Sequence, residues 1–248
     1  MPKPKISIIT VVYDGVSTID RCITSVLGQN FDNLEYIIVD GGSTDGTVGI
    51  IRKYKDRINV IVSEKDQGIY DAMNKGIALA TGDIIGTLNA DDFFTDNEVL
   101  DEIARIFEQS TVDILYSNLD FVRENGSISR KWRSGKYNAG KFNWGWMPPH
   151  PTFYCHKKLF EDFGGYRLDY GSAADYELML RFMHLNNKNI YYLNKVTVRM
   201  QTGGVSNKSL ANRVQAMRYD LRAMKNNNVA IPVLAILFKP LRKIAQFF

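Results

Sequence analysis

The sequence predicts an α/β fold in which a mainly parallel central sheet carries helices on both faces. Apolar runs of strand length alternate with segments of helical periodicity through roughly the first hundred residues, as in βαβ units. The first run, residues 5–13, is β-branched and almost continuously apolar, which is typical of a strand covered on both faces. With 248 residues, of which 45% are hydrophobic and 23% charged, the chain suits one large α/β domain or a domain plus an appendage.

Each predicted element follows from its local pattern. Ser17 or Thr18 is the expected N-cap of the first helix, and Ser43 opens the second. Asn125-Gly126 predicts a hairpin between residues 119–124 and 127–132. The expected strands are residues 5–13, 34–39, 58–62, 83–88, 112–117 and, near the end of the domain, 191–200, and the expected helices are 19–27, 43–54, 68–80 and 97–107.

Polar clusters fall at the predicted carboxyl ends of three strands. They are Tyr13-Asp14, Asp40-Gly41-Gly42 and Asp91-Asp92. Ligands of open parallel sheets bind outside the carboxyl ends of the strands, so the clusters predict a nucleotide-type site. Adjacent carboxylates repel each other unless a positive charge lies beside them, and Mg²⁺ binds through one or two carboxylates plus substrate phosphates. Taken alone, Asp91-Asp92 is equally compatible with a loop that caps a helix beginning near Asp96.

The turn after Asp40 has a structural part and a functional part. Asp45 and Thr47 are expected to cap the following helix. Asp40 has no local capping duty in this interpretation, so its carboxylate is free to accept hydrogen bonds from a base edge or a ribose hydroxyl. The glycines of the turn do not form the Rossmann fingerprint, and the chain contains no Walker A sequence.

The C-terminal residues are strongly basic, and the two cysteines are far apart in the sequence. Residues 205–248 carry eight basic side chains and one acidic side chain, a net charge of +7, which leaves −3 for the first 204 residues. This basic tail indicates an anionic surface as its partner, and nucleic acid is disfavoured because no aromatic-interleaved basic motif accompanies it. Cys22 and Cys155 match no metal or redox spacing and are expected to be buried free thiols.

A cytoplasmic location is favoured by the N-terminal segment. Its apolar run is too short for the apolar core of a signal peptide plus a cleavage site. No stretch of about 18 or more apolar residues predicts a transmembrane helix. Because the tail is basic, we also expect the cytoplasmic protein to bind peripherally to the inner face of the plasma membrane.

Several segments together resemble a known family. ISIITVVYDG, YIIVDGGSTDGT, DQGIYDAMNKGIALATGD and LNADD occur in this order and are followed by PPHPTFY, GGY and SAADYELMLR. Their order and spacing are similar to those of glycosyltransferase family 2, which has the GT-A nucleotide-sugar fold, over residues 5–204. The resemblance implies a catalytic domain over residues 1–206, with a nucleotide-binding half (1–117) and an acceptor-side half (118–206), and leaves 207–248 as a helical extension.

The family implies inverting transfer of one sugar from a nucleoside-diphosphate donor to an acceptor hydroxyl. A UDP-sugar is the favoured donor, and the expected acceptor is a saccharide or lipid-linked molecule in bacterial cell-surface polysaccharide or glycolipid assembly. By position, Thr10, Val11 and Tyr13 would line the nucleotide pocket, and Asp40 would hold the base. Asp66 and Lys75 would contact the donor, while Asp91 and Asp92 would hold the ribose and a bridging Mg²⁺ or Mn²⁺. Asp175 would be the general base.

Three positions depart from the family pattern. Asn89 stands where many members carry Asp, which weakens one metal ligand to a neutral oxygen. Met73 replaces a common Arg and leaves Lys75 as the nearest cation for the donor phosphates, while Ala174 replaces the usual Glu and leaves Asp175 as the single carboxylate. The Gln-x-x-Arg-Trp motif of processive members is absent from the sequence, which favours single-sugar transfer.

The chemistry of an inverting transferase agrees with this pattern. It requires one carboxylate to take the acceptor proton and no enzyme nucleophile, and the sequence contains no G-x-S-x-G motif. The alternative is a catalytically inactive nucleotide-sugar-binding subunit or scaffold of a glycan assembly complex. The presence of Asp175 together with Asp40, Asp91 and Asp92 favours the enzyme, since a binding protein has no need for Asp175.

The acceptor side and the tail allow two interpretations each. Trp146 lies among aromatic residues that either stack on sugar rings or pack in the core, and His150, between prolines, either touches phosphate or acceptor or is structural. The loop 203–206 is expected to close over the donor.

In the tail, residues 229–248 are apolar, interrupted by Pro232 and Pro240, and carry basic residues. This composition suits an interfacial membrane helix or a helix packed on the domain or on a dimer partner, so an oligomer stays open.

Overall fold

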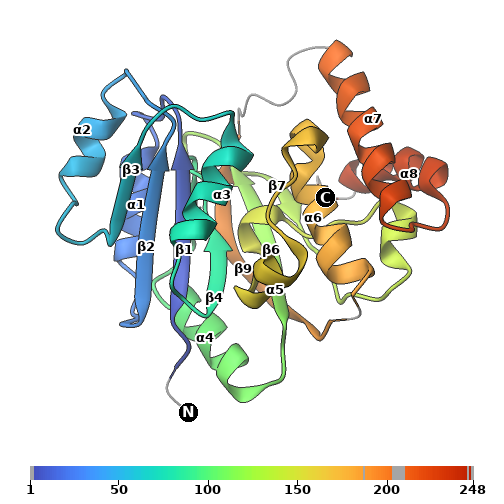
Figure 1. The fold of residues 1–248 in the computed structure, drawn as a ribbon, viewed down its shortest axis with the longest axis horizontal. Coiled ribbons are helices and arrows are strands. Elements are labelled where there is room, and N and C mark those ends of the chain that lie inside the picture. The colour runs from blue at the N-terminus through green and yellow to red at the C-terminus, as the bar shows by residue number, and fades with distance from the viewer. Residues whose placement is uncertain (1–2, 187, 203–209, 245, 247–248) are drawn as a thin grey trace.

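A nine-stranded sheet forms the centre of the part of the chain that the structure describes (Figure 1). The structure is a computed structural model and describes residues 3–186, 188–202, 210–244 and 246. The strand order is β3-β2-β1-β4-β8-β6-β9-β5, and β7 pairs with β6 outside this path. This mixed but mostly parallel sheet with flanking helices confirms the fold class predicted from the sequence. The predicted loop 203–206 lies outside the described residues.

Four parallel strands build the N-terminal half of the sheet. They are β1 (Ile6–Val12), β2 (Leu34–Asp40), β3 (Val60–Ser63) and β4 (Ile84–Thr87). β1 lies between β2 and β4, and β2 also pairs with β3, always in parallel register. Parallel strands place their carboxyl ends at one edge, so the segments that follow these four strands meet there.

The second half of the sheet mixes directions. β8 (Tyr154–His156) runs antiparallel between β4 and β6 (Ile114–Val122), and β9 (Ile190–Gln201) runs parallel to β6. The predicted hairpin is present as β6 and β7 (Ile128–Trp132). β5 (Asp92–Phe94) pairs antiparallel with β9. Neither β5 nor β8 follows from the sequence pattern, because each has three residues and depends on a partner far along the chain.

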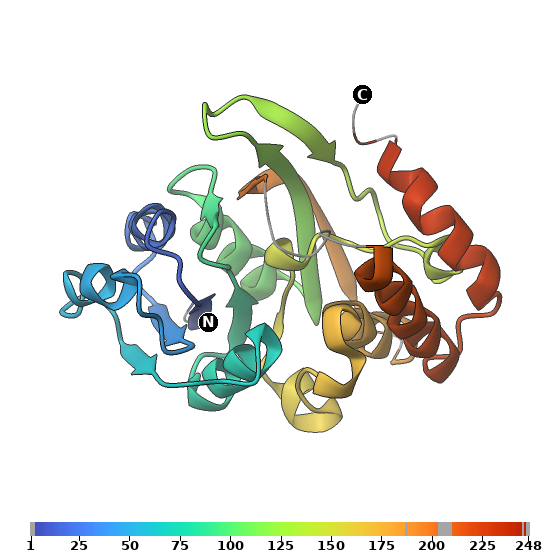
Figure 2. The same cartoon turned by 90° about the horizontal axis from the view of Figure 1, so that it is seen from above.

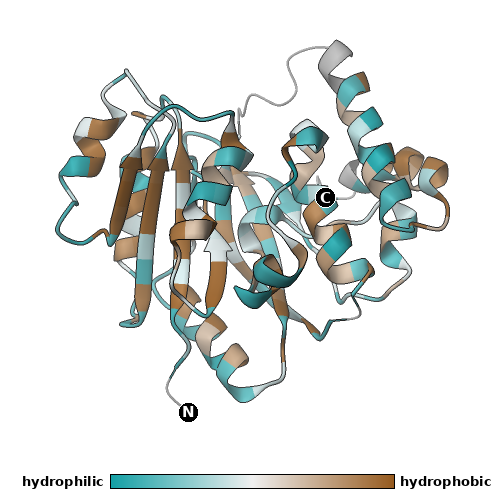
Figure 3. Ribbon diagram, viewed as in Figure 1, coloured by the Kyte–Doolittle hydropathy of each residue, from teal (hydrophilic) through white to brown (hydrophobic). Residues whose placement is uncertain are grey.

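Helices cover both faces of the sheet, and each face has its own core. Along β1, the side chains of Ile6 and Ile8 join the core on one face, and Ile9 and Val11 join the core on the other. The alternation follows from the two-residue period of a strand, and the hydrophobic colouring of the N-terminal strands in Figure 3 reflects their burial on both sides. The first core includes residues of α1 (Ile19–Leu27), α2 (Thr47–Arg52) and α4 (Val99–Gln109), and the second includes residues of α3 (Ile69–Leu79), α5 (Lys158–Phe163) and α6 (Ala174–Met179).

Two C-terminal helices pack against the acceptor-side half. Figure 2 shows α7 (Leu210–Asn226) and α8 (Pro232–Ile244) side by side at the end of the molecule away from β3. α7 contacts the short helix η3 (Leu168–Ala173), and α8 contacts the short helix η1 (Lys141–Trp144). No helix within the described residues is long and apolar enough to cross a membrane. The remaining short helices are η2 (His150–Thr152) and η4 (Leu180–His184).

A buried glutamate ties β1, β2 and the end of α3 together at the edge opposite the carboxyl ends. Glu35 of β2 accepts hydrogen bonds from Lys5 Nζ (2.9 Å), Ser7 Oγ (2.6 Å) and the Thr81 amide (2.7 Å). Burial alone would raise the pKa of Glu35, but the hydrogen bonds from Ser7 and Thr81 outweigh it and lower the pKa from 4.5 to about 2. The ionised carboxylate therefore contributes to the free energy of unfolding.

Glu35→Gln is expected to lower the free energy of unfolding by up to about 3 kcal/mol near pH 7. Because the folded-state pKa is depressed, the contribution of Glu35 is complete above pH 4.5 and disappears as the pH falls towards 2. The difference between the variant and the wild type should therefore shrink with falling pH in urea titrations. Glu161→Gln, at an exposed carboxylate, is the control, and a Glu35→Gln difference that stays constant with pH would contradict this account.

Candidate active site

Asp40 closes β2 and is completely buried. Its Oδ2 accepts hydrogen bonds from the amides of Gly42 (3.2 Å) and Ser43 (3.1 Å) and from Ser63 Oγ (2.7 Å). The expectation that Asp40 has no local capping duty is therefore wrong, since one oxygen holds the turn. Its Oδ1 has no hydrogen-bond partner among the described residues. Since a buried carboxylate oxygen is costly without a donor, this second oxygen is available to a ligand.

A glycine brings Tyr13 and Asp66 close to this turn. A Cβ at Gly41 would lie 2.6 Å from Asp66 Oδ2 and 3.3 Å from the Tyr13 ring, so a larger residue would displace both. The Tyr13 ring is 68% exposed, and Asp66 Oδ1 accepts a hydrogen bond from the Gly68 amide at 2.8 Å. Three of the residues expected to contact the donor, Tyr13, Asp40 and Asp66, thus meet at one edge of the sheet.

The loop after β1 is fastened to the loop after β2. Asp14, with a positive φ of 47°, accepts a hydrogen bond from the Thr44 amide at 2.9 Å. Asp45 accepts hydrogen bonds from the amides of Val16 (3.0 Å) and Thr47 (3.0 Å). These contacts give Asp45 and Thr47 a structural role and hold the Tyr13 loop in place beside Asp40. The expectation that they cap the helix is wrong, because Thr47 is the first residue of α2 and the N-cap is Gly46, with no side-chain capping hydrogen bond.

Thr10 and Val11 are buried in the body of the domain. The Thr10 hydroxyl accepts a hydrogen bond from the Tyr36 hydroxyl at 3.1 Å, and its Oγ1 lies 3.6 Å from Cys22 Sγ. Val11 belongs to the core on the opposite face. Their side chains point away from the edge, so only the backbone at these two positions is left to line a pocket.

Asp92 is the first residue of β5, so the helix-capping loop is not its structure. Its side chain is fully buried, and neither carboxylate oxygen has a hydrogen-bond partner among the described residues. Burial, followed by repulsion from Asp91, raises the pKa of Asp92 well above its ordinary value. Burial also raises the pKa of Asp91, which is partly exposed. Arg21 partly offsets both shifts.

These carboxylates fit a hard divalent cation. Asp92 presents two unpartnered oxygens, and Asn89 Oδ1 is also buried without a partner among the described residues. Mg²⁺ and Mn²⁺ prefer oxygen ligands, and Mg²⁺ is bound through one or two carboxylates with phosphates and waters completing its shell. The described part of the chain contains no cluster of three or more His, Cys, Asp or Glu that could hold a metal ion. A cation held by these residues would need other ligands, such as phosphates and waters, to complete its shell.

Lys75 is engaged by other groups. Its Nζ lies 2.8 Å from Glu64 and 3.7 Å from Asp71, and it donates a hydrogen bond to the Lys65 carbonyl at 3.2 Å. The hydrogen bond to Glu64 is the main reason why the pKa of Lys75 is raised. Contact between Lys75 and donor phosphates would require these ion pairs to open.

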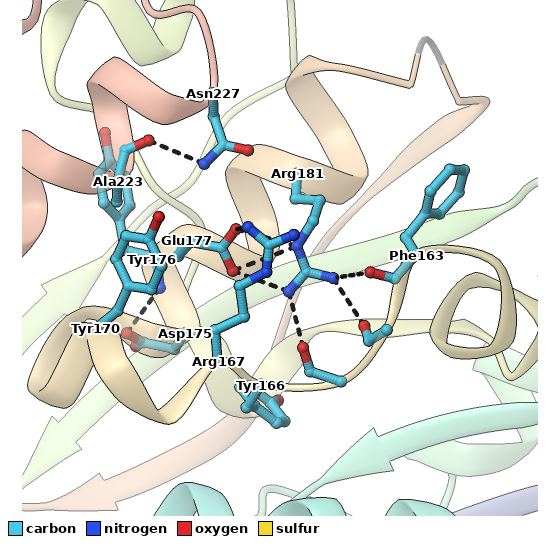
Figure 4. Close-up of polar contacts among 12 residues, drawn as sticks. Phe163, Tyr166, Arg167, Tyr170, Asp175, Tyr176, Glu177, Arg181, Ala223 and Asn227 are labelled. Atoms are coloured by element: carbon cyan, nitrogen blue, oxygen red, sulfur yellow. Dashed lines mark hydrogen bonds and ion pairs between the residues drawn. The ribbon is translucent and has the colours of Figure 1, made fainter.

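Asp175 lies in the first turn of α6, and a buried ion-pair network fixes that helix (Figure 4). Glu177 is completely buried and pairs with Arg181 at 2.8 Å and with Arg167 at 3.3 Å. Arg181 also donates hydrogen bonds to the carbonyls of Gly164 (2.7 Å) and Gly165 (2.8 Å). Asp175 itself is partly exposed, and its Oδ1 accepts the Tyr176 amide at 2.7 Å. The network fixes the helix that carries Asp175, and the Asp175 side chain remains partly exposed.

Three aromatic side chains connect Asp175 to the strand edge. His150 Nε2 lies 2.7 Å from the Tyr166 hydroxyl and 3.5 Å from Thr87 Oγ1 at the end of β4. The Tyr166 and Tyr70 ring centroids are 5.3 Å apart, and the pKa of Tyr70 is raised well above its ordinary value by burial and then by Asp175. Burial also lowers the pKa of His150. Tyr70 and Tyr166 had no individual role in the sequence interpretation, although both lie within the motif segments.

Trp146 occupies the core rather than the surface. Its side chain is buried, and its Nε1 donates a hydrogen bond to the Ser134 carbonyl at 2.9 Å. Its ring packs against those of Tyr116 and Phe142, with centroids 5.5 and 5.3 Å away. Of the two roles that the sequence left open, core packing describes its position. Trp144 is the half-exposed tryptophan of this segment, and it packs against Phe238 of α8 at 5.3 Å.

Two sets of carboxylates lie on the two halves of the molecule. Asp40, Asp91 and Asp92 lie at the carboxyl edge of the sheet, where Asp40 Oδ1 and both oxygens of Asp92 have no hydrogen-bond partner among the described residues. Asp175 is reached from that edge through Tyr70, at the start of α3, and lies on the other half of the molecule. A diphosphate with its cation on one side and a proton acceptor on the other is the arrangement that displacement of a diphosphate requires.

Comparison with known proteins shows the family of this chain. The model of the family described as Glycosyl transferase family 2 matches residues 7–166. A PGL/p-HBAD biosynthesis glycosyltransferase of Mycobacterium tuberculosis is 30% identical over 185 residues, which cover 73% of this chain and 70% of the relative.

Two solved structures have the same fold. TarS 1–349 of S. aureus in complex with UDP superposes with a TM-score of 0.70 at 20% identity, covering 97% of this chain and 72% of that chain. A mannosyltransferase of Pyrobaculum calidifontis in complex with GDP-Man and Mn²⁺ gives a TM-score of 0.68 at 17% identity, covering 95% of this chain and 69% of that chain. With its GT-A-like fold and its match to the family model and to a curated relative, the chain belongs to glycosyl transferase family 2.

Proposed function

We propose that this glycosyltransferase moves one sugar from a nucleoside-diphosphate donor to an acceptor hydroxyl with inversion at the anomeric carbon. One observation carries the proposal: buried, unpartnered carboxylate oxygens of Asp40 and Asp92 lie at the carboxyl edge of the sheet, and Asp175 is reached from that edge through Tyr70. A buried carboxylate oxygen is costly unless a hydrogen-bond donor or a cation pairs with it. A nucleotide sugar with its metal supplies both.

A UDP-sugar is the donor that we favour. Asp40 Oδ1 would accept a hydrogen bond from the base or ribose, and the exposed Tyr13 ring would lie against the base, with Asp66 next to it. The UDP bound in the S. aureus TarS structure supports uracil, and the GDP-Man bound in the Pyrobaculum calidifontis structure makes guanine the competing base.

Asp91 and Asp92 would hold the divalent cation, with the Asn89 amide oxygen close to it. When bound, Mg²⁺ or Mn²⁺ supplies Lewis-acid stabilisation of the negative charge that develops on the leaving diphosphate. Support comes from the unpartnered oxygens of Asp92 and Asn89 and from the Mn²⁺ that accompanies GDP-Man in the Pyrobaculum calidifontis structure. Burial of Asp92 excludes water, which strengthens its interaction with the charge of the cation.

Asp175 would act as the general base. Its carboxylate takes the proton of the acceptor hydroxyl while the hydroxyl oxygen bonds to the anomeric carbon and the bond to the diphosphate oxygen breaks. Since Asp175 takes only the proton, one displacement inverts the configuration. The partial exposure of Asp175 and the rigid α6 network around Glu177 suit this task, because a base needs both access and a fixed position.

The proposed acceptor is a saccharide or lipid-linked molecule in bacterial cell-surface polysaccharide or glycolipid assembly. The relative named for PGL biosynthesis supports a glycolipid acceptor. The absence of the processive Gln-x-x-Arg-Trp motif from the sequence supports transfer of a single sugar. We place the enzyme in the cytoplasm, peripheral on the inner face of the plasma membrane, where such acceptors are available.

Donor screening tests the proposed function most directly. UDP with Mn²⁺ is expected to raise the unfolding temperature by several degrees, since a ligand at about 100 times its Kd stabilises by about 2.7 kcal/mol. The panel should contain UDP, GDP, TDP and ADP, each with Mn²⁺ and with excess chelator. A larger thermal shift with GDP than with UDP would show that the donor carries guanine instead of uracil. No shift with any nucleotide would contradict a nucleotide-sugar site.

Asp92→Asn is expected to abolish transfer and the Mn²⁺-dependent part of the UDP shift. Without metal, the variant should be at least as stable as the wild type, because it removes an unpartnered buried charge. Thermal unfolding with and without Mn²⁺ separates the two effects. Asp96→Asn, at a partly exposed carboxylate paired with Lys195, is the matched control. Full activity of the wild type in excess chelator would rule out the metal role.

Asp175→Asn is expected to lower kcat by about 10² to 10⁴, the usual range for the loss of a positioned base. UDP affinity should stay nearly unchanged, because Asp175 takes its proton from the acceptor and not from the donor. Asp169→Asn is the matched control on the preceding turn, where the carboxylate pairs with Arg222. Near-native turnover of Asp175→Asn would show that the base lies elsewhere.

A further inference from the structure

One face of α8 is fixed on the domain. Ala235 is completely buried, and Phe238 packs on Trp144 with ring centroids 5.3 Å apart. Lys239 Nζ lies 2.7 Å from Asp220 of α7 and 3.8 Å from the centroid of the Tyr176 ring. These contacts set the rotation of the helix about its own axis, so its opposite face must point away from the domain.

That opposite face is apolar and exposed. Val233, Leu237 and Leu241, named here the α8 stripe, are 63%, 58% and 55% exposed. A spacing of four residues places them on one side of the helix, along about 12 Å of its axis. Ile231, just before the helix, is also more than half exposed. An exposed row of large aliphatic side chains on a fixed helix is typical of an interaction surface.

Positive charge accompanies the α8 stripe. Arg242 directly follows Leu241 and is exposed. Lys141 of η1 does not add to this charge, because its Nζ donates a hydrogen bond to the Ser134 carbonyl at 3.4 Å and lies 5.1 Å from the centroid of the buried Trp146 ring. Asp220 is the one acidic residue in the sequence from 205 to 248, and Lys239 already pairs with it. The surface around the stripe therefore favours an anionic partner.

We propose that the α8 stripe, together with Arg242, docks on an anionic lipid surface. The aliphatic side chains would enter the acyl boundary while Arg242 contacts the lipid phosphates, as in interfacial amphipathic helices. A two-fold dimer through this face would bring the stripe and Arg242 against their own copies, and the charges would repel. The inference rests on the proposed location at the membrane and does not depend on the transfer reaction.

Flotation of the full chain with lipid vesicles tests the docking surface. The wild type should float with vesicles of phosphatidylcholine and phosphatidylglycerol and much less with phosphatidylcholine alone, and high salt should release it. Leu237→Glu should weaken binding at least tenfold, because it places a charge in the acyl boundary. Arg242→Gln should weaken it about fivefold, which corresponds to about 1 kcal/mol for one surface cation.

Leu79→Glu, at an exposed leucine of α3, is the matched control and should float as the wild type does. Equal flotation of Leu237→Glu and the wild type would overturn the proposal. So would a wild type that ignores vesicles and is dimeric in light scattering while Leu237→Glu is monomeric. The UDP and Mn²⁺ thermal shift, measured on the same variants, separates the two proposals: vesicle binding without any nucleotide shift would contradict the proposed function and leave the docking surface intact.

Discussion

A carboxylate buried without a hydrogen-bond donor is among the costliest groups in a folded protein, and the candidate site is built around one. Asp92 is held in this position by its backbone, because β5 pairs with β9 and Asp92 lies opposite Met200. The backbone pairing of β5 with β9 therefore places the Asp92 side chain in a buried position, where the loss of hydration disfavours its charged form. Such local costs persist only when the surrounding structure determines the conformation strongly, and they concentrate at functional sites.

The parallel half of the sheet and its polar edge could be predicted because their signals are local. β1 and β2 are buried along almost their whole length, and amphipathic segments separate them, so a parallel sheet and its common edge follow from general rules, whereas the strand order was not predicted. Asp40 and the pair Asp91-Asp92 were found as polar residues at the ends of apolar runs. The hairpin was found from Asn125-Gly126, where Gly126 has a positive φ of 79°.

The remaining features depend on contacts between distant segments. β5 exists because β9, about a hundred residues later, supplies its partner, and so the sequence pattern gives no sign that Asp92 is a strand residue. Trp144 and Trp146 are two residues apart, yet one is half-exposed and the other buried, because Gly145 has a positive φ of 67° between them. The ion pair of Lys75 with Glu64 likewise depends on the approach of α3 to the loop after β3.

The contact of Lys239 with Tyr176 joins the C-terminal helices to the packed body that carries Asp175, because Tyr176 is the neighbour of Asp175. A tail joined through a flexible linker would let an active site work at a range of heights above a surface. Here packed helices set the separation between the α8 stripe and Asp175. An enzyme docked through that stripe would select acceptors by length, because an acceptor of the wrong length would hold its hydroxyl above or below the level of the base.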